Sequence, residues 1–522
     1  MISCMKRWIY VGILWCCSLC FVWGQALNTP PKVVVGISVD GLNRDYLSLF
    51  WHELSQGGFK RLVSEGTTFD SFSYGYQSAG NAPDIATLQT GSLPYLHGIA
   101  GDNYFVRKSA KSIPVTADPS AHSFGLDVAH SAHRLQVSTL ADQLNEDSQN
   151  RAQIVSIAIN PTVATLQVGH SGLALWMDKK TGRWTTSSYY ETALPSWAGK
   201  TADDYLNKRW EPLHLAALYY AAPRVRNKNF VYDLNQFCYG SAKYEQFATT
   251  PYANDMVVDL AMEAVQNYAI GKDLQTDMLL LQFSLQPLFT QQTDGLTLEL
   301  EDAYLRLDKE LESLLDFLDK RFGQKEVLVY LTGTRALPHQ KPHNEHVPSQ
   351  SFCTYRYMAL LNAYLMAHYG SYSWVQGSWN GHIYLDRQQI EQQGKDLRQV
   401  QQTAVNFFAT IPGVMNVSTS FQLNEAFIGA RQLHYAFHAN SSGDLVFSLL
   451  PGWYEVDKYE KPTGFVSRYN TTTQLYLWGW HIPVQQILQE VDATHFAPTL
   501  ARWLRISQPN ASKGGCLPIL LP

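Results

Sequence analysis

The feature that most constrains the fold is an almost unbroken apolar run near the start of the chain. Residues 33–39 read VVVGISV, are rich in β-branched side chains, and are followed by Asp40 and Gly41. Such a run is typical of a strand that is buried on both faces of a parallel sheet, here with Asp40 at its carboxyl end. Because sites in parallel α/β proteins form at the carboxyl ends of strands, Asp40 is the first candidate site residue.

Similar apolar runs recur along the chain, separated by segments with helical periodicity. The predicted strands are residues 33–39, 154–159, 278–283 and 327–331, and the predicted helices are residues 255–268 and 298–322. In the last helix, apolar residues fall at helical spacing and charged residues occupy the other face. This alternation predicts an α/β fold with a mainly parallel central sheet flanked by helices. With 522 residues, 45% of them hydrophobic, the chain can bury a large core.

Two stretches fit this core less well and are interpreted as insertions that cap a site. Residues from about 171 to 240 and from about 339 to 440 are rich in aromatic residues and contain glycine. We therefore expect a single domain over residues 25–522 with these two insertions. Aromatic segments such as SYSWVQGSWNGH at 371–382 would suit contact with a glycan or a protein, although most such rings pack in cores.

The first 24 residues have the pattern of a cleavable signal peptide. Lys6 and Arg7 precede an apolar run over residues 8–23, and cleavage is expected after Gly24. The run is short for a membrane span, and its cysteines lack the preceding small residue that lipidation needs, so both alternatives are minor. We expect export to the periplasm or the cell surface, with no transmembrane segment in the mature chain. Acidic residues (45) outnumber basic ones (40), which argues against nucleic acid as a partner.

Few cysteines follow the signal. They are Cys238, Cys353 and Cys516. Their wide spacing excludes a compact zinc knuckle, and their number permits at most one disulfide, whose pairing the sequence does not identify.

Several motifs fall in the order and spacing of a known family. They are GISVDGLNRDYL at 36–47, GGFKRLVSEGTTF at 57–69, LQTGSLPYLHGIAGDN at 88–103, GDLVFSLLPGWYE at 443–455 and HFAPTLARWLRI at 495–506. Through them the chain resembles the alkaline phosphatase superfamily, and most nearly the phosphate-irrepressible alkaline phosphatases of Bacteroidetes-type bacteria, which are related to nucleotide pyrophosphatase/phosphodiesterases. The resemblance covers about residues 32–506 and implies an alkaline-phosphatase-like core. It also implies two zinc ions, held by Asp and His, that activate a Thr or Ser nucleophile.

Most of the metal ligands that the resemblance implies are missing. Asp40 is retained at the first ligand position. The other ligand positions hold Pro287, Gln291, Thr334, Arg335 and Thr463. None of these side chains is a good zinc ligand, and the fixed charge of Arg335 would repel a cation. We expect an ion pair between Asp40 and Arg335 to fill the emptied position.

The nucleophile and the phosphate-binding groups are also replaced. Asn81 stands upstream of the TGSLP motif where the superfamily has its nucleophile, and a carboxamide cannot be ionised into one. At the former phosphate-binding positions, Asn160 and Thr162 replace Lys and Arg. Asp102 replaces an Asn there, and as an anion it would repel a phosphoryl group. No catalytic residue is assigned.

These replacements fall on catalytic positions while the scaffold motifs stay readable, which indicates a degenerate site. The predicted function is that of a pseudophosphatase, an extracytoplasmic binding or scaffold protein with an unidentified protein or glycan partner and no expected cofactor. The alternative is a divergent metal-dependent phosphomonoesterase or phosphodiesterase with two zinc ions at a relocated or altered site. A zinc content of about two per chain would distinguish the alternative from the main interpretation.

A relocated metal site has one candidate segment. PHQKPHNEH at 338–346 brings His339, His343 and His346 together with Glu345, which are residue types that zinc accepts. The prolines make this segment a loop, and a surface loop without metal is the favoured interpretation.

A metal-free hydrolase is a further alternative. It would use Ser73, Ser78 or Asp84 near the old nucleophile position. No histidine can be placed beside the serines as a base. Asp84 is expected to cap a helix over residues 85–89 instead.

Overall fold

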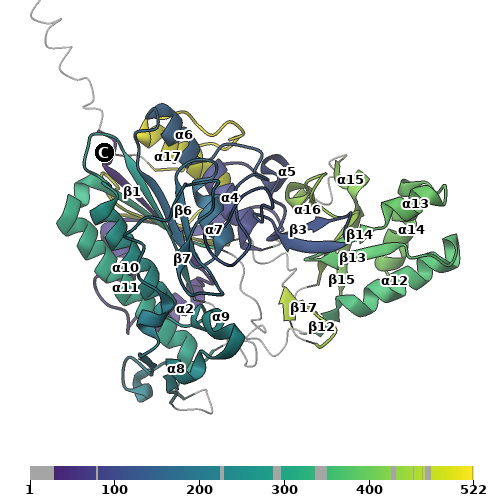
Figure 1. Cartoon of the computed structure of the whole chain (residues 1–522), viewed down its shortest axis with the longest axis horizontal. Helices are drawn as coiled ribbons and strands as arrows, with labels where there is room; N and C mark the ends of the chain where they lie inside the picture. Colours follow the sequence, from purple (N-terminus) through teal and green to yellow (C-terminus); the bar gives the residue numbers. More distant parts are fainter. Residues whose placement is uncertain are drawn as a thin grey trace, which may run out of the picture.

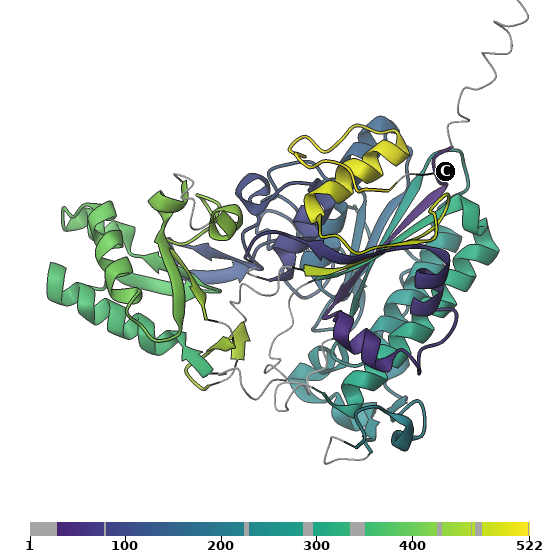
Figure 2. The ribbon, with the colours of Figure 1, turned by 180° about the vertical axis from the view of Figure 1, so that it is seen from behind.

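The computed structural model describes residues 29–77, 80–223, 229–285, 296–334, 350–424, 431–450, 452–460, 462–464, 472–519 and 521. Figure 1 shows a large lobe built around one long sheet and, to its right, a small lobe formed by residues from 350 to 460. The view from behind shows the same two parts (Figure 2). The expectation of one domain with two insertions stays a prediction.

Ten strands of the described chain form the central sheet of the large lobe, in the order β20–β2–β19–β11–β1–β10–β5–β6–β7, with β21 beside β2. They are β1 (Val33–Asp40), β2 (Thr67–Ser73), β5 (Ile154–Ala158), β6 (Leu173–Met177), β7 (Trp184–Thr185), β10 (Asp277–Ser284), β11 (Val327–Thr334), β19 (Thr472–Gly479), β20 (Gln485–Ile487) and β21 (Val491–Asp492). Strands β11, β1, β10, β5 and β6 pair in parallel, and β19 is antiparallel to β11. This confirms the predicted α/β fold with a mainly parallel sheet.

The central strand β1 is buried over its whole length because helices cover both faces of the sheet. Val33, Val35, Ile37 and Val39 belong to the core cluster that includes helices α10 (Tyr252–Asn267) and α11 (Leu298–Phe322). Val34, on the other face, belongs to the cluster that includes helices α4 (Asn81–Thr90), α7 (Pro161–Val168) and α17 (Phe496–Leu504) (Figure 1). The period-2 alternation of a strand places these two sets on opposite faces.

The main predicted elements are present close to their predicted bounds. The helix predicted over residues 298–322 is α11 with the same ends, and the helix predicted over 255–268 is α10, which begins earlier at Tyr252. The strand predicted over 327–331 continues to Thr334. No helix within the described ranges is long and apolar enough to cross a membrane. The predicted signal peptide, residues 1–24, lies outside the described residues, and Cys238, Cys353 and Cys516 are unpaired thiols.

The small lobe has its own sheet and its own core. Its sheet has the order β13 (Val375–Trp379), β14 (His382–Leu385), β16 (Leu445–Leu449), β15 (Val414–Thr419), and it packs against α12 (Thr354–Tyr369), α13 (Arg387–Gln392) and α14 (Leu397–Phe408). Strands β12 (Gln350–Cys353), β17 (Trp453–Val456) and β18 (Pro462–Gly464) pair at its edge. The core of this lobe, which includes Phe352, Leu361, Trp374 and Phe447, is separate from the two clusters of the large lobe.

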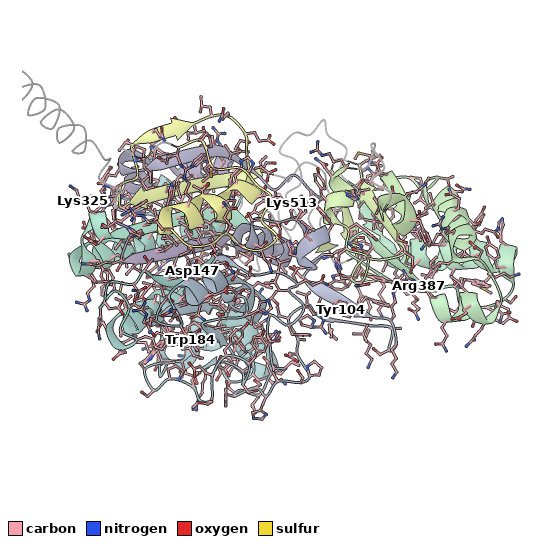
Figure 3. All side chains as sticks on the ribbon, turned by 90° about the horizontal axis from the view of Figure 1, so that it is seen from above. Tyr104, Asp147, Trp184, Lys325, Arg387 and Lys513 are labelled. Carbon is pink, nitrogen blue, oxygen red and sulfur yellow. The ribbon has the colours of Figure 1, made fainter. Side chains whose placement is uncertain are left out.

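A hairpin of the large lobe, β3 (Asn103–Val106) and β4 (Lys111–Pro114), reaches the small lobe. Phe105 stacks on Tyr384 with ring centroids 4.1 Å apart, and the Arg107 guanidinium lies 2.8 Å from the fully buried Asp444 carboxylate. Viewed from above, Tyr104 lies between the two parts and Arg387 lies in the small lobe (Figure 3).

The remaining elements connect or cover these layers. They are α2 (Arg44–Phe50), α3 (Phe59–Glu65), α5 (Pro94–His97), α6 (Leu140–Asp147), β8 (Arg209–Trp210), β9 (Tyr232–Asp233), α8 (Leu234–Phe237), α9 (Lys243–Phe247), α15 (Ser420–Asn424) and α16 (Arg431–Ala436), with short 3₁₀ turns between some of them.

Candidate functional site

Asp40 lies at the carboxyl end of β1, between Ser284 of β10 and Thr334 of β11 in the sheet register. Its Oδ1 accepts hydrogen bonds from Asn81 Nδ2 at 2.7 Å and from the Thr334 hydroxyl at 2.9 Å. Burial raises the pKa of Asp40 to about 6, although these two hydrogen bonds act to lower it. The retained carboxylate is therefore held by two neutral side chains.

Asn81 is the first residue of α4 and is 8% exposed. The chain enters this helix through Gly80, whose φ is +126°, and a Cβ on Gly80 would overlap the Asp102 carboxyl group. A side chain at position 80 is thus excluded by both backbone conformation and space. The tight entry directs the Asn81 carboxamide at Asp40, where the superfamily would place a hydroxyl.

Asp102 closes the same corner from the other side. Its Oδ1 accepts the backbone N–H of Ala82 at 2.7 Å, in the first turn of α4. Burial raises the pKa of Asp102 to about 7; the charges of Asp40 and Asp84 act in the same direction, and the N–H groups of Ala82 and Asn81 act to lower it. This carboxyl group binds the start of α4, and the expectation that it repels a phosphoryl group stays a prediction.

The expected helix-capping role of Asp84 is wrong. This residue was expected to cap a helix over residues 85–89, but α4 begins at Asn81, with Gly80 as its N-cap, and Asp84 is fully buried inside the helix. Its Oδ1 accepts the Tyr76 hydroxyl at 2.8 Å. A serine-based site gains no support in the described part of this region, because the Nε2 of buried His97 lies 3.1 Å from Thr87 and its Nδ1 accepts the Ile99 N–H.

The two former phosphate-clamp positions have structural roles in the fold. Asn160 is the N-cap of α7, and its side-chain oxygen accepts the N–H of Thr162 at 2.9 Å. The Thr162 hydroxyl lies 3.1 Å from the hydroxyl of Thr116, which in turn lies 2.8 Å from His130 Nδ1. Neither residue carries a charge for a phosphoryl oxygen.

Several predicted positions lie outside the described residues. They are Ser78, Pro287, Gln291, Arg335, His339, His343 and His346, and the side chain of Thr463. The expected ion pair between Asp40 and Arg335 therefore stays a prediction. Thr334, which directly precedes Arg335 in the chain, donates a hydrogen bond to Asp40, as Asn81 does. Within the described ranges, no group of three or more His, Cys, Asp or Glu side chains is arranged to hold a metal ion.

The donor chemistry around Asp40 does not fit a pair of zinc ions. Zinc sites use Cys, His, Asp or Glu, with about four donors to each ion. Here the atoms beside the Asp40 carboxylate are a carboxamide nitrogen and a hydroxyl, which both donate to it. The types at the other ligand positions, a proline, a glutamine, an arginine and two threonines, add no carboxylate or imidazole.

Sequence reasoning identified the positions at this corner and missed how they are held. The signal for the turn was present in Gly80, directly before Asn81. The bond between Thr334 and Asp40 had no sequence signal of its own, because it depends on the register of β1 and β11.

Known proteins resemble this sequence over nearly the whole chain. The family model described as type I phosphodiesterase / nucleotide pyrophosphatase matches residues 34–477. The chain is 28% identical to a protein of Myroides odoratus named calcium-transporting ATPase, over 96% of both chains. It is 26% identical to alkaline phosphatase PhoV of Synechococcus elongatus (94% of this chain, 93% of the relative) and 25% identical to alkaline phosphatase PafA of Elizabethkingia meningoseptica (98% of each).

Solved structures agree on the fold. The crystal structure of wild-type alkaline phosphatase PafA superimposes with a TM-score of 0.84 at 24% identity, covering 94% of this chain and 99% of the other. Murine ectonucleotide pyrophosphatase/phosphodiesterase 5 gives a TM-score of 0.51 at 13% identity, covering 94% and 97%. At these identities the likeness establishes the architecture.

Proposed function

Since the chain belongs to the type I phosphodiesterase / nucleotide pyrophosphatase family, within the alkaline phosphatase superfamily, we propose that it keeps the fold of these phosphoester hydrolases without their zinc-dependent chemistry and acts as a binding protein. In this proposal it is exported by its signal peptide and works in the periplasm or at the cell surface.

One observation carries the proposal. At the start of α4, where a Thr or Ser nucleophile is expected, the Asn81 carboxamide donates a hydrogen bond of 2.7 Å to Asp40. A carboxamide has no hydroxyl to deprotonate, so it cannot act as the nucleophile that forms a phosphoryl ester. The same bond places a donor N–H against Oδ1 of the retained carboxylate, an atom that a metal ligand would direct at the ion.

The phosphate-binding side supports the same conclusion. Asp102, Asn160 and Thr162 hold backbone groups or hydroxyls of the protein itself. Two neutral side chains, Asn160 and Thr162, stand in place of the cationic clamp that the resemblance implies, and the carboxyl group of Asp102 stands in place of an Asn. Both the chemistry and the binding of a phosphoester are therefore weakened at this corner.

A second function is favoured by the relatives. Alkaline phosphatases PhoV and PafA match this chain over 93% and 98% of their own lengths, which supports a divergent phosphoester hydrolase as the alternative. Such an enzyme would hold two zinc ions through a changed ligand set, with His339, His343 and His346 as the candidates. Zinc, when bound, would supply a metal-activated nucleophile in place of the missing hydroxyl.

The test is a joint measurement of metal and turnover. The purified mature chain is incubated with excess zinc, desalted and analysed for zinc, and assayed with p-nitrophenyl phosphate and bis-p-nitrophenyl phosphate. We expect far less than one zinc per chain and no turnover, with alkaline phosphatase PafA of Elizabethkingia meningoseptica as the positive control. About two zinc ions per chain, with turnover that a chelator abolishes, would select the hydrolase.

A single substitution sharpens this test. Asn81→Thr restores the residue type of the nucleophile but not the metal ligands, so we expect no zinc-dependent turnover from it. Asn81→Ala is the matched control, because it removes the same bond to Asp40 without adding a hydroxyl. Zinc-dependent hydrolysis by Asn81→Thr and not by Asn81→Ala would contradict our interpretation of the site.

A further inference from the structure

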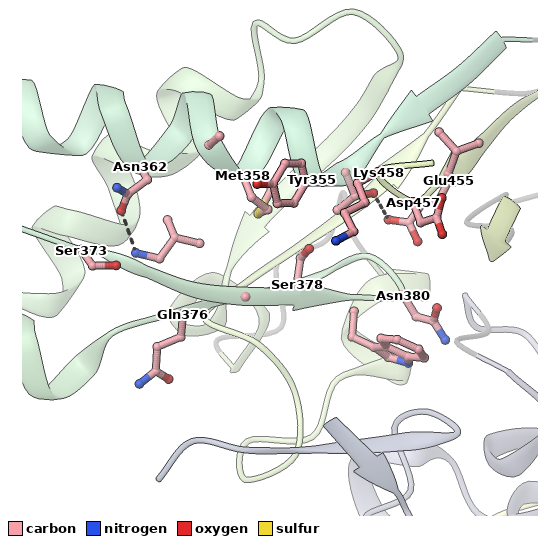
Figure 4. Close-up of a pocket in the computed structure, with 16 residues that line it drawn as sticks. Tyr355, Met358, Asn362, Ser373, Gln376, Ser378, Asn380, Glu455, Asp457 and Lys458 are labelled. Atoms are coloured by element: carbon pink, nitrogen blue, oxygen red, sulfur yellow. Dashed lines mark hydrogen bonds between the residues drawn. The ribbon is translucent and has the colours of Figure 1, made fainter. Parts of the chain in front are cut away.

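The small lobe contains a cavity of about 540 Å³ whose lining does not include Asp40, Asn81 or Asp102, the residues of the corner described above. It lies between the first turns of α12, strand β13 and the end of β17 (Figure 4). Ser373 and residues 375–380, which line one wall, come from the aromatic segment that the sequence analysis singled out. Its size is within the range of small-molecule sites.

Part of the lining is apolar and carries an aromatic ring at its edge. The apolar side chains are those of Met358 and Ala359 of α12, Val375 of β13 and Val456 of β17. Tyr355, one turn before Ala359, is 67% exposed, so its ring stands at the mouth. In Figure 4, Tyr355 and Met358 lie on α12 opposite Ser378 on β13.

The rest of the lining, called the polar wall, is fixed by hydrogen bonds. Successive residues of a strand point to opposite faces, and Gly377 faces Phe105 of the large lobe, so Ser378 points to the cavity. The carboxyl group of Glu455 is 2% exposed and accepts the Thr354 hydroxyl at 3.0 Å. Asn362 Oδ1 accepts the N–H groups of Trp374 and Val375 at 2.7 and 3.1 Å, which ties β13 to α12. The polar wall is thus preorganised.

The charges of the lining argue against a phosphoester or another anion as the occupant. Two carboxyl groups, those of Glu455 and Asp457, line the cavity beside one ammonium group, that of Lys458. The Lys458 Nζ lies 4.8 Å from the centre of the Tyr459 ring, which engages part of its charge outside the lining. Since carboxyl groups outnumber ammonium groups in the lining, an anion entering here would find no excess of positive charge.

We propose that this cavity binds a neutral carbohydrate, a short oligosaccharide or one terminal unit of a glycan. Hydroxyl and amide side chains around the polar wall match sugar hydroxyls, which both donate and accept hydrogen bonds. The apolar wall and the Tyr355 ring match the C–H face of a pyranose. The inference deepens the proposed binding role, on which it rests, by naming the site and the class of ligand.

The test is titration of the mature protein with neutral tetrasaccharides of glucose, mannose, galactose and N-acetylglucosamine, followed by calorimetry and saturation-transfer NMR. We expect one of these to bind the native chain, and Tyr355→Ala to weaken its binding at least tenfold. Tyr239→Ala is the matched control, since Tyr239 is 68% exposed on the large lobe, and we expect its affinity to stay within twofold. Ser378→Phe, which fills the cavity, should abolish binding.

Three results would overturn the inference: binding of none of these sugars at millimolar concentration, binding that both Tyr355→Ala and Ser378→Phe leave unchanged, or binding of choline in place of the sugars. Near-ultraviolet circular dichroism of each variant checks that the small lobe is folded. The zinc and turnover measurements on the same protein decide the proposed function separately. A protein without turnover that binds no sugar would refute only the carbohydrate inference.

Discussion

The corner formed by Asp40, Asn81 and Asp102 and the cavity of the small lobe both contain polar side chains, but these side chains have different surroundings. At the carboxyl end of β1, Asn81 and Thr334 donate to Asp40. In the small lobe, Tyr355 and Ser378 border an open space of about 540 Å³. Polar groups that satisfy one another inside the protein offer little to a ligand, whereas polar groups around a preformed space can bind one. The comparison teaches that residue types alone do not locate a working site.

The two regions also differ in what stabilises them. The corner lies on the central sheet, between two large core clusters, whereas the cavity depends on the small core of residues around Phe352 and Trp374. Asp444 joins the small lobe to the hairpin β3–β4: its carboxylate binds Arg107 at 2.8 Å, Arg387 at 2.7 Å and the N–H of Leu385 at 2.9 Å. We therefore expect the small lobe to be the more easily perturbed part.

Asp444→Ala is expected to have the largest effect. It leaves two arginines and a buried N–H without their partner and should lower the free energy of unfolding of the small lobe by roughly 2–4 kcal/mol. Differential scanning calorimetry should show a small-lobe transition that moves to lower temperature while the large-lobe transition stays. Sugar binding should be lost with it.

The control for this variant is Asp316→Ala. Asp316 forms an exposed pair with Arg61, its side chain is 50% exposed, and its loss should cost less than about 1 kcal/mol. If Asp444→Ala lowers both transitions together, the two parts unfold as one unit and the comparison of separate cores fails.

The sequence was sufficient for the central sheet because burial on both faces leaves a strong signal. Residues 33–39 and 327–331 are continuous apolar runs, and both became neighbouring parallel strands. The helix over 298–322 was predicted because apolar residues recur at helical spacing and charged residues mark its exposed face, and the structure shows in addition that Thr297 caps its start and Gly323 follows its end. The sheet of the small lobe was not predicted, because its strands are short and the pairing of β14 and β15 with β16 joins residues far apart in the chain.

For the site, the sequence predicted that the zinc-dependent chemistry is missing, which stays a prediction, and it did not indicate how the residues at these positions are held. Asn81 and Thr334 were recognised as replacements, yet their hydrogen bonds to Asp40 follow from strand register and from the turn at Gly80. The protonation of Asp102 depends on burial and on the nearby charges of Asp40 and Asp84, which no pattern of residue types encodes. The cavity likewise arises from the packing of α12 against β13, which no motif announces.

The second prediction concerns Asp102, at the corner with Asp40 and Asn81. Burial raises the pKa of Asp102 from 3.8 to about 7, so the folded protein binds this proton more tightly than the unfolded chain does. The carboxyl group therefore costs stability increasingly as the pH rises from about 4 to about 7. Asp102→Asn keeps an oxygen for the Ala82 N–H and removes this cost, and we expect a gain on the order of 2 kcal/mol at pH 8 and a smaller gain at pH 5.

Thermal unfolding of the large lobe at pH 5 and pH 8 measures this difference. Asp118→Asn is a control of opposite sign: burial acts to raise its pKa, but hydrogen bonds from Ser120 and Ser131 lower it to about 2. That variant should lose stability at pH 8. A loss of stability at pH 8 in Asp102→Asn would show that the ionised carboxylate is favoured at the corner and that the corner is still built for charge.

The smallest effect is expected for Glu455→Gln, in the wall of the cavity. Burial raises the pKa of Glu455 from 4.5 to about 7, a smaller displacement than that of Asp102, and the Thr354 hydroxyl acts to lower it. Because the folded-state pKa is raised, the stability that Glu455 contributes falls as the pH rises through this interval. Glutamine does not ionise, so Glu455→Gln should raise the unfolding temperature of the small lobe at pH 8 by about one or two degrees more than at pH 5. The control is Glu391→Gln, on the exposed face of α13. We expect it to leave the unfolding temperature unchanged at both pH values. Equal shifts at the two pH values would mean that Glu455 does not titrate between pH 5 and pH 8, which would contradict the raised pKa on which this prediction rests.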